Sequence, residues 1–313
     1  MLLAALAVLA LAAFPAAHSA ALSALVLPQS FADTYGAKCL DGTPPAIYYS
    51  LNASSSTWLL FLEGGGWCFD TTPSGTIANC FGRAAGGGGS SAGIRNGSTM
   101  DIGGLLSDDP AVSPFFHTAN RIFMHYCDGS SYSSYRPAPI AAPADLPASL
   151  AASAPPQIWM RGRACLQAVT QYLLQHLGMA GGKELVVSGG SAGATGVYLS
   201  LDFIRNWVPP TLAVAGAPDA GYFLDLPRAS TNDTWYRDCF NASSSVWNGT
   251  DLASPQCMAA HPTEIWRCYL AEYNVRPPLP APHTACRARS LPAPLLPPPS
   301  PPPDILHLHS HAH

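Results

Sequence analysis

The chain has 313 residues, of which 48% are hydrophobic and only 11% charged, with a formal net charge of -4. This length is enough for one large domain with a buried core, or for two small ones. The composition excludes a chain that is disordered throughout, and the charge gives no reason to expect nucleic acid as a partner.

Residues 1–20 are predicted to be a signal peptide. Their apolar run is followed by small residues, and cleavage after Ser19 or Ala20 fits this pattern. The alternative is an uncleaved anchor, because apolar residues resume up to Leu27. The run before His18 is shorter than the ~20 residues that cross a bilayer, so we expect no stable membrane span after signal cleavage.

Sequons and cysteines both indicate a secreted protein in an extracellular or cell-wall location. Five N-x-S/T sequons occur, at Asn52, Asn96, Asn232, Asn241 and Asn248. Eight of the nine cysteines lie between Cys39 and Cys268, which predicts four disulfides. Cys68 and Cys80 are close enough in sequence for a local bridge. A zinc site is not expected, because these cysteines and histidines lack the usual ligand spacings.

Four short apolar runs are predicted to be strands. They span residues 58–62, 121–126, 184–188 and 211–215. A helical pattern over 158–177 precedes the third run, and another follows Ser191 and ends before Pro209. Strands that alternate with helices predict right-handed crossovers and a mainly parallel sheet flanked by helices. The glycine-rich segment 86–93 is expected to be a flexible surface loop.

The character of the sequence changes at residue 276. Residues 276–313 are rich in proline, end in alternating histidines and are expected to be a disordered tail. The α/β domain is therefore expected to span 21–275 and to lack its C-terminal strands.

The pattern Gly189-x-Ser191-x-Gly193 follows a predicted strand and precedes a predicted helix. This is the signature of a nucleophile elbow, in which small neighbours allow a sharp turn that exposes the serine hydroxyl. The alternative is a structural glycine-rich turn. We predict that Ser191 is the nucleophile of an esterase.

A second glycine-rich segment, E-G-G-G-W at 63–67, follows the first predicted strand. Acyl transfer requires N–H donors aimed at the developing oxyanion. The residue after the nucleophile, Ala192, supplies one donor, and Gly65 and Gly66 are predicted to supply the others. The alternative is an ordinary turn at the end of a strand.

The chain resembles the pectin acetylesterases and their relative Notum, a carboxylesterase, over roughly residues 39–275. The matching motifs are C-L-D-G-T-P-P-A at 39–46, L-F-L-E-G-G-G-W-C at 60–68, G-G-L-L-S at 103–107, N-R-I-F-M-H-Y-C-D-G-S-S-Y at 120–132, I-W-M-R-G at 158–162, S-G-G-S-A-G at 188–193, D-A-G-Y-F-L-D at 219–225 and W-R-C-Y-L-A-E-Y at 266–273. This resemblance implies an α/β-hydrolase fold, a Ser-His-Asp triad without a cofactor, and hydrolysis of O-acyl esters. It places Gly65, Gly66 and Ala192 at the oxyanion positions, and Trp67 beside the acyl group.

The triad acid and base implied by the resemblance are not found. In the family they follow the W-x-C-x-x-A-E-Y segment, where this chain has Arg-Pro-Pro-Leu-Pro. Asp219 comes one strand too early for the acid, and Asp128 precedes the nucleophile, so both are placed in the substrate pocket or given a structural role. His261 and His283 have no strand end to hold them, and His125 is interpreted as a packed core residue.

Three functions remain open. The first is a secreted carboxylesterase that acts on O-acetyl groups of a polysaccharide. The second is an inactive binding protein or a shortened product, since a chain without its triad base loses most esterase activity. The third is a Notum-like deacylase of a lipidated protein.

Overall fold

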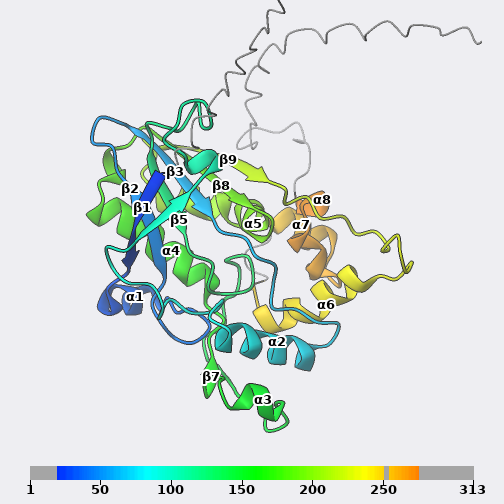
Figure 1. Ribbon diagram of the computed structural model, residues 1–313. Coiled ribbons are helices and arrows are strands. Elements are labelled where there is room, and N and C mark those ends of the chain that lie inside the picture. Colours follow the sequence, from blue (N-terminus) through cyan, green and yellow to red (C-terminus); the bar gives the residue numbers. More distant parts are fainter. Residues whose placement is uncertain (1–19, 250–253, 275–313) are drawn as a thin grey trace, which may run out of the picture.

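The computed structural model describes residues 20–249 and 254–274, and Figure 1 shows their arrangement. Most of the predicted signal peptide and the whole proline-rich tail lie outside the described residues. The strands are β1 (Ala20–Val26), β2 (Ala46–Ser50), β3 (Thr57–Leu62), β4 (Thr99–Ile102), β5 (Asn120–Met124), β6 (Ile140–Ala141), β7 (Gln157–Ile158), β8 (Glu184–Gly190) and β9 (Ala213–Asp219). The α-helices are α1 (Gln29–Tyr35), α2 (Pro73–Ala85), α3 (Ala148–Ala151), α4 (Gly162–His176), α5 (Ala192–Trp207), α6 (Trp235–Trp247), α7 (Pro255–Ala260) and α8 (Ala271–Asn274). The 3-10 helices within the described residues are η1 (Gly104–Leu106), η2 (Met179–Gly181) and η4 (Ile265–Tyr269).

Seven strands form one mixed sheet in the order β4-β1-β2-β5-β3-β8-β9. Strands β5, β3, β8 and β9 are parallel, and β8 crosses to β9 through α5. These four are the strands that the apolar runs predict, so the predicted α/β fold with parallel strands flanked by helices is confirmed. The antiparallel strands β4, β1 and β2 were not predicted.

Strand β1 is one of the strands that the sequence did not predict. Residues 20–26 continue the apolar N-terminal run, for which the sequence predicts a signal peptide or, alternatively, an anchor. In the structure they pair with β2 and β4, and Leu22 is fully buried. The predicted cleavage site therefore adjoins the start of β1. Within residues 20–249 and 254–274, no helix combines the length and the apolar character that crossing a bilayer requires.

Side chains alternate between the two faces of the sheet, and each face has its own core. On one face, Leu60, Leu62 and Val187 belong to the main core, to which α4 and α5 also contribute. On the other face, Leu59 packs with Leu22 and Leu106 in a smaller cluster. The nearly continuous apolar sequence of β3 follows from this burial on both sides.

The disulfide prediction was partly wrong. The predicted bridge Cys68–Cys80 is present, together with Cys39–Cys127 and Cys257–Cys268. The remaining two of the eight, Cys165 and Cys239, are buried free thiols in the described part of the chain. The four-bridge prediction counted cysteines, whereas pairing depends on which of them the fold brings within bonding distance.

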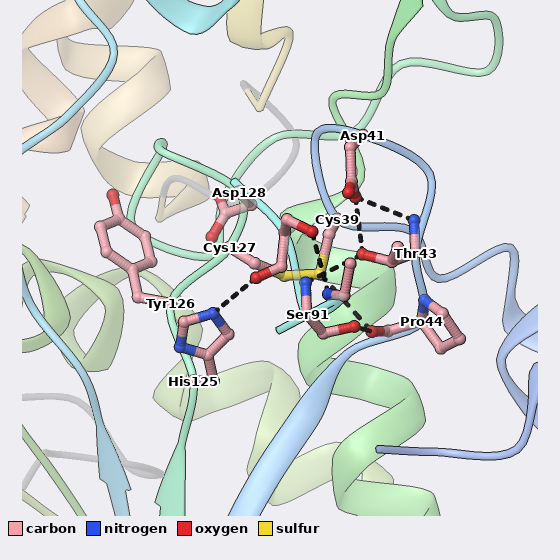
Figure 2. The surroundings of a disulfide bond; sticks show 12 residues. Cys39, Asp41, Thr43, Pro44, Ser91, His125, Tyr126, Cys127 and Asp128 are labelled. Atoms are coloured by element: carbon pink, nitrogen blue, oxygen red, sulfur yellow. Dashed lines mark hydrogen bonds between the residues drawn. A yellow bond between two sulfur atoms is a disulfide. The ribbon is translucent and has the colours of Figure 1, made fainter. Parts of the chain in front are cut away.

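The segment 86–93 lies largely on the surface but is anchored at Ser91. Ser91 is 2% exposed, its N–H donates to Thr43 Oγ1 (3.0 Å), and its hydroxyl donates to the Pro44 carbonyl (2.6 Å). Figure 2 shows Ser91 beside the Cys39–Cys127 disulfide. Five of the eight residues are exposed, as predicted for a surface loop, and the contacts of Ser91 tie the loop to the body of the domain.

Candidate active site

Ser191 lies between the end of β8 and the start of α5, and it is exposed. Its backbone has φ 53° and ψ -118°, which a residue with a Cβ rarely adopts. The Ser191 N–H donates to the Asp219 carbonyl at the end of β9 (3.1 Å). The turn therefore has the geometry expected of a nucleophile elbow.

The glycines around Ser191 are required by close packing against the end of β3. A methyl group at Gly193 would overlap the Leu62 carbonyl oxygen, and one at Gly189 would lie 2.7 Å from the Gly193 carbonyl carbon. A methyl group at Gly64 would lie 3.2 Å from Ser191 Cβ. The elbow and the first glycine of the second segment are thus in direct contact.

We expect Gly193→Ala to lower the free energy of unfolding by about 3 kcal/mol, because the start of α5 must move away from β3. Gly82→Ala is the matched control: Gly82 is also helical, and its methyl group would meet only Leu150 Cδ2, at 3.9 Å. That variant is expected to be as stable as wild type or up to about 1 kcal/mol more stable. Urea denaturation measures both, and equal effects of the two substitutions would contradict the packing argument.

The segment Gly64–Gly66 follows β3 and runs beside the elbow. Gly65 has φ 120° and Gly66 has φ 68°. In the described part of the chain, neither of their N–H groups has a hydrogen-bond acceptor. The N–H of Ala192, in the first turn of α5, has no intrahelical acceptor either. Three backbone donors around Ser191 are therefore available to a ligand.

Trp67 links the two glycine-rich segments. Its indole N–H donates to Ser131 Oγ (2.7 Å), and that hydroxyl donates to the Ala192 carbonyl (2.6 Å). The Trp67 ring is 7% exposed and packs edge-on against Phe223 (4.9 Å) and Phe240 (5.1 Å between centroids). Trp67 is thus linked through Ser131 to the residue after Ser191, and most of its surface is covered by aromatic side chains.

The two aspartates predicted for the substrate pocket have different surroundings. Asp128 is 1% exposed and accepts hydrogen bonds from the N–H groups of Ser130 (3.0 Å) and Tyr132 (3.2 Å). Burial raises the pKa of Asp128, against the lowering effect of the hydrogen bonds from Ser130. Asp219 is exposed at the end of β9, and its carbonyl accepts the Ser191 N–H. The Asp128 carboxylate thus holds its own loop, and only Asp219 adjoins Ser191.

No histidine in residues 20–249 and 254–274 forms a hydrogen bond with Ser191. The His261 ring packs edge-on against Tyr273 (5.1 Å), and His117 Nδ1 faces the Ser113 carbonyl (3.2 Å). The His176 ring packs at a tilt against Tyr172, with 4.6 Å between the ring centroids. His283 lies outside the described residues. The described site therefore contains the serine and the N–H donors without a base.

His125 is not a packed core residue, contrary to the prediction from the sequence. Its Nδ1 lies 2.9 Å from Glu63 Oε2, and its Nε2 lies 3.0 Å from the Ser90 carbonyl. The same Glu63 oxygen accepts the Tyr126 N–H (2.7 Å). Figure 2 shows His125 next to Tyr126 and the disulfide. The sequence could have predicted this contact, because Glu63 follows β3 and His125 follows β5, and these two strands are parallel neighbours.

His125 and Glu63 form an ion pair at low pH. Burial lowers the pKa of His125, but the hydrogen bond and charge of Glu63 and the Ser90 carbonyl outweigh burial and the charge of Arg83, so the pKa is raised above 6.5. Both neighbours of the ring are hydrogen-bond acceptors, and an imidazolium ring can donate to both. The pair is partly exposed, so its contribution to stability is modest.

We expect the His125 pair to stabilise the fold by about 1 kcal/mol at low pH relative to His125→Gln. Because the folded pKa is raised, this contribution is fully present below about pH 6.5 and is lost as the pH rises through the folded pKa. Urea denaturation of wild type and variant from about pH 5.5 to about pH 9 measures the difference. A difference that stays constant or grows with pH would contradict the pairing.

Comparison with known proteins supplies the family. A family model described as Pectinacetylesterase matches residues 19–280. The chain belongs to the pectinacetylesterase family. It is similar to palmitoleoyl-protein carboxylesterase NOTUM of Drosophila melanogaster (30% identity, 78% of this chain, 34% of the relative) and to pectin acetylesterase 5 of Arabidopsis thaliana (30% identity, 80% and 54%). The chain thus spans about a third to a half of these relatives.

Solved structures agree with this family assignment. The Wnt deacylase Notum from Drosophila matches with a TM-score of 0.67 and 28% sequence identity, over 81% of this chain and 67% of that one. The shared fold confirms the resemblance to the pectin acetylesterases and Notum that the sequence motifs indicate.

Proposed function

We propose that this chain is a secreted serine carboxylesterase that hydrolyses O-acetyl esters of a polysaccharide. The observation that carries the proposal is the exposed Ser191 at φ 53°, in contact with a segment whose Gly65 and Gly66 N–H groups have no acceptor in the described residues. Membership of the pectinacetylesterase family supports the same chemistry.

In the proposed reaction, Ser191 Oγ attacks the ester carbonyl carbon as its proton passes to a base. The carbonyl oxygen becomes an oxyanion that accepts from the N–H groups of Gly65, Gly66 and Ala192. Collapse expels the alcohol, which takes the proton, and water then hydrolyses the acetyl-serine. The described residues supply no such base, so the proposal requires one from outside residues 20–249 and 254–274.

A short acyl group and a polymeric alcohol fit the surroundings of Ser191. The serine is exposed, so a large substrate can reach it. Trp67, which is linked through Ser131 to the Ala192 carbonyl, is 7% exposed and packed among aromatic rings, and on this ground we propose a short acyl group. Asp219, exposed next to Ser191, is proposed to contact the substrate. One relative's name includes palmitoleoyl-protein, so a long-chain substrate is the competing choice.

Secretion is supported by disulfides and sequons. Three disulfides form in the described residues, as suits an oxidising compartment. Asn232 and Asn241, two of the sequon asparagines, are exposed. We propose that residues 1–20 are removed as a signal peptide.

The function is tested on the full chain secreted from a eukaryotic host. A fluorophosphonate probe is expected to modify Ser191, as peptide mapping by mass spectrometry reports. Release of acetate from acetylated pectin is expected, with preference for an acetyl over a palmitoleoyl ester when the two compete. Acetate release without labelling of Ser191 would refute the role of the serine. Preference for the palmitoleoyl ester would indicate that the protein is a deacylase of lipidated protein.

A binding protein without turnover is the second candidate, and the lack of a histidine beside Ser191 in the described residues favours it. Such a protein would retain the donors of Gly65, Gly66 and Ala192 and use them to hold an acyl carbonyl. Calorimetry with acetylated and deacetylated pectin separates the two functions. Binding of the acetylated form without release of acetate would assign the binding function.

A further inference from the structure

Arg83, in the last turn of α2, contacts the glycine segment beside Ser191. Its Nη1 donates to the Gly65 carbonyl (2.9 Å), and its Nε donates to the Gly88 carbonyl (3.1 Å). The guanidinium lies 4.7 Å from the centre of the Tyr126 ring, in a cation–π contact. These three contacts hold the Arg83 guanidinium next to the segment Gly64–Gly66.

The bond to the Gly65 carbonyl sets the direction of the next N–H. The Gly65 carbonyl and the Gly66 N–H belong to one trans peptide unit, in which the two groups point in opposite directions. Since the carbonyl points to Arg83, the Gly66 N–H points away from it. A methyl group added at Gly66 would meet no atom within 4 Å, so the space around Gly66 is open.

Without Arg83, nothing intrinsic to the segment would hold this orientation. Gly65 and Gly66 have φ 120° and 68°, and two consecutive glycines have access to many other conformations. A positive charge on the carbonyl also polarises the peptide group, which makes the opposite N–H a stronger donor.

Arg83 itself is held by groups that do not belong to the oxyanion hole. Its Cδ is in close contact with the backbone of Gly129, where a methyl group would lie 3.0 Å away. The Tyr126 ring beneath the guanidinium is fixed by its hydroxyl, which accepts the Ser131 N–H (2.8 Å). Gly129 and the Tyr126 ring therefore restrict where the Arg83 side chain can lie.

We propose that Arg83 is a positioning residue of the esterase site, and that it aims the Gly66 N–H at the oxyanion through the Gly65 carbonyl. This inference rests on the proposed function, because it assigns the N–H donors to an oxyanion. Arg83 touches neither the substrate nor Ser191 and acts on the transition state through the peptide unit.

The variants are Arg83→Met, which removes both carbonyl bonds, and Arg83→Lys, whose single ammonium reaches one carbonyl at a time. Arg161→Met is the matched control. Arg161 Nε donates to the Gly36 carbonyl (2.8 Å), its Nη1 donates to the Arg136 carbonyl (3.2 Å), and its guanidinium lies 4.6 Å from the Tyr135 ring. The control thus loses the same kinds of contact away from Ser191.

Two kinetic readouts separate positioning from a structural role. For acetyl ester hydrolysis by the full chain, Arg83→Met is expected to lower kcat about 10²-fold with little change in KM. Labelling by two organophosphorus probes that differ only in P=O and P=S compares a strong with a weak hydrogen-bond acceptor. Arg83→Met should reduce the wild-type preference for P=O about tenfold, Arg83→Lys should restore part of it, and Arg161→Met should leave it unchanged.

An NMR readout makes the test independent of activity. In protein labelled with ¹⁵N-glycine, the residual dipolar coupling of the Gly66 N–H is expected to collapse in Arg83→Met and to persist in Arg161→Met. A Gly66 coupling that is unchanged in Arg83→Met overturns the inference, as does an unchanged P=O preference. A wild-type chain that neither labels at Ser191 nor turns over refutes the proposed function, and the NMR result then still decides whether Arg83 orients the peptide.

Discussion

Replacing Ser191 by alanine is expected to lower kcat for acetyl ester hydrolysis by about 10⁴-fold or more, and to abolish labelling by a fluorophosphonate. The reason is that the proposed reaction passes through a covalent acetyl-serine. The backbone donors of Gly65, Gly66 and Ala192 remain in the variant, so binding of acetylated pectin should persist. Stopped assays of acetate release and calorimetry measure the two effects separately.

Ser188→Ala is the matched control for this prediction. Ser188 lies three residues earlier, in β8, and is fully buried, and its hydroxyl donates to the Ala217 carbonyl (2.7 Å). Its removal should cost about 1 kcal/mol of stability and leave kcat unchanged. A Ser188→Ala enzyme as slow as Ser191→Ala would mean that the loss comes from damage to β8.

The size of the Ser191 effect also reports on the base. Triad residues act as a unit, so removing the serine costs little when its base is already absent. Ser191→Ala with unchanged slow turnover would therefore contradict the esterase proposal and favour the binding function. A large loss would show that a base reaches Ser191 in the full chain.

Removing the Cys39–Cys127 disulfide is expected to have the largest effect on stability. The bridge closes a loop with a sequence separation of 88, and Figure 2 shows it between the segment that carries Asp41 and the end of β5. The loss of this constraint on the unfolded chain corresponds to about 4.6 kcal/mol. Guanidinium denaturation of the Cys39→Ala/Cys127→Ala double variant measures the free energy of unfolding.

The Cys68–Cys80 bridge provides the control for loop length. All four cysteines are buried, but this second bridge has a sequence separation of only 12, which corresponds to about 2.8 kcal/mol. Both double variants lose buried sulfur atoms, so the difference between their free energies of unfolding reports the effect of loop length. Equal losses, or a larger loss for the short loop, would contradict the entropic origin of the effect.

The sequence was sufficient to predict the parallel half of the sheet. The centres of strands β3 and β8 are largely buried and therefore read as short apolar runs, with glycines following soon after each run. The antiparallel strands were harder to recognise. In β4, the residues alternate between exposed and half-buried, and β1 continues a longer apolar run. Local pattern does not distinguish a strand at the sheet edge from a loop, or a first strand from the end of a leader.

The sequence by itself determined the family, the sharp turn at Ser191 and the glycine segment beside it, because steric crowding at such turns restricts which residues are allowed. Only the tertiary structure decided how charged residues far apart in the chain support that segment. Arg83 on α2 meets the Gly65 carbonyl, and His125 after β5 meets Glu63 after β3. Such contacts depend on the distance between elements in the folded molecule, and no spacing along the chain encodes that distance.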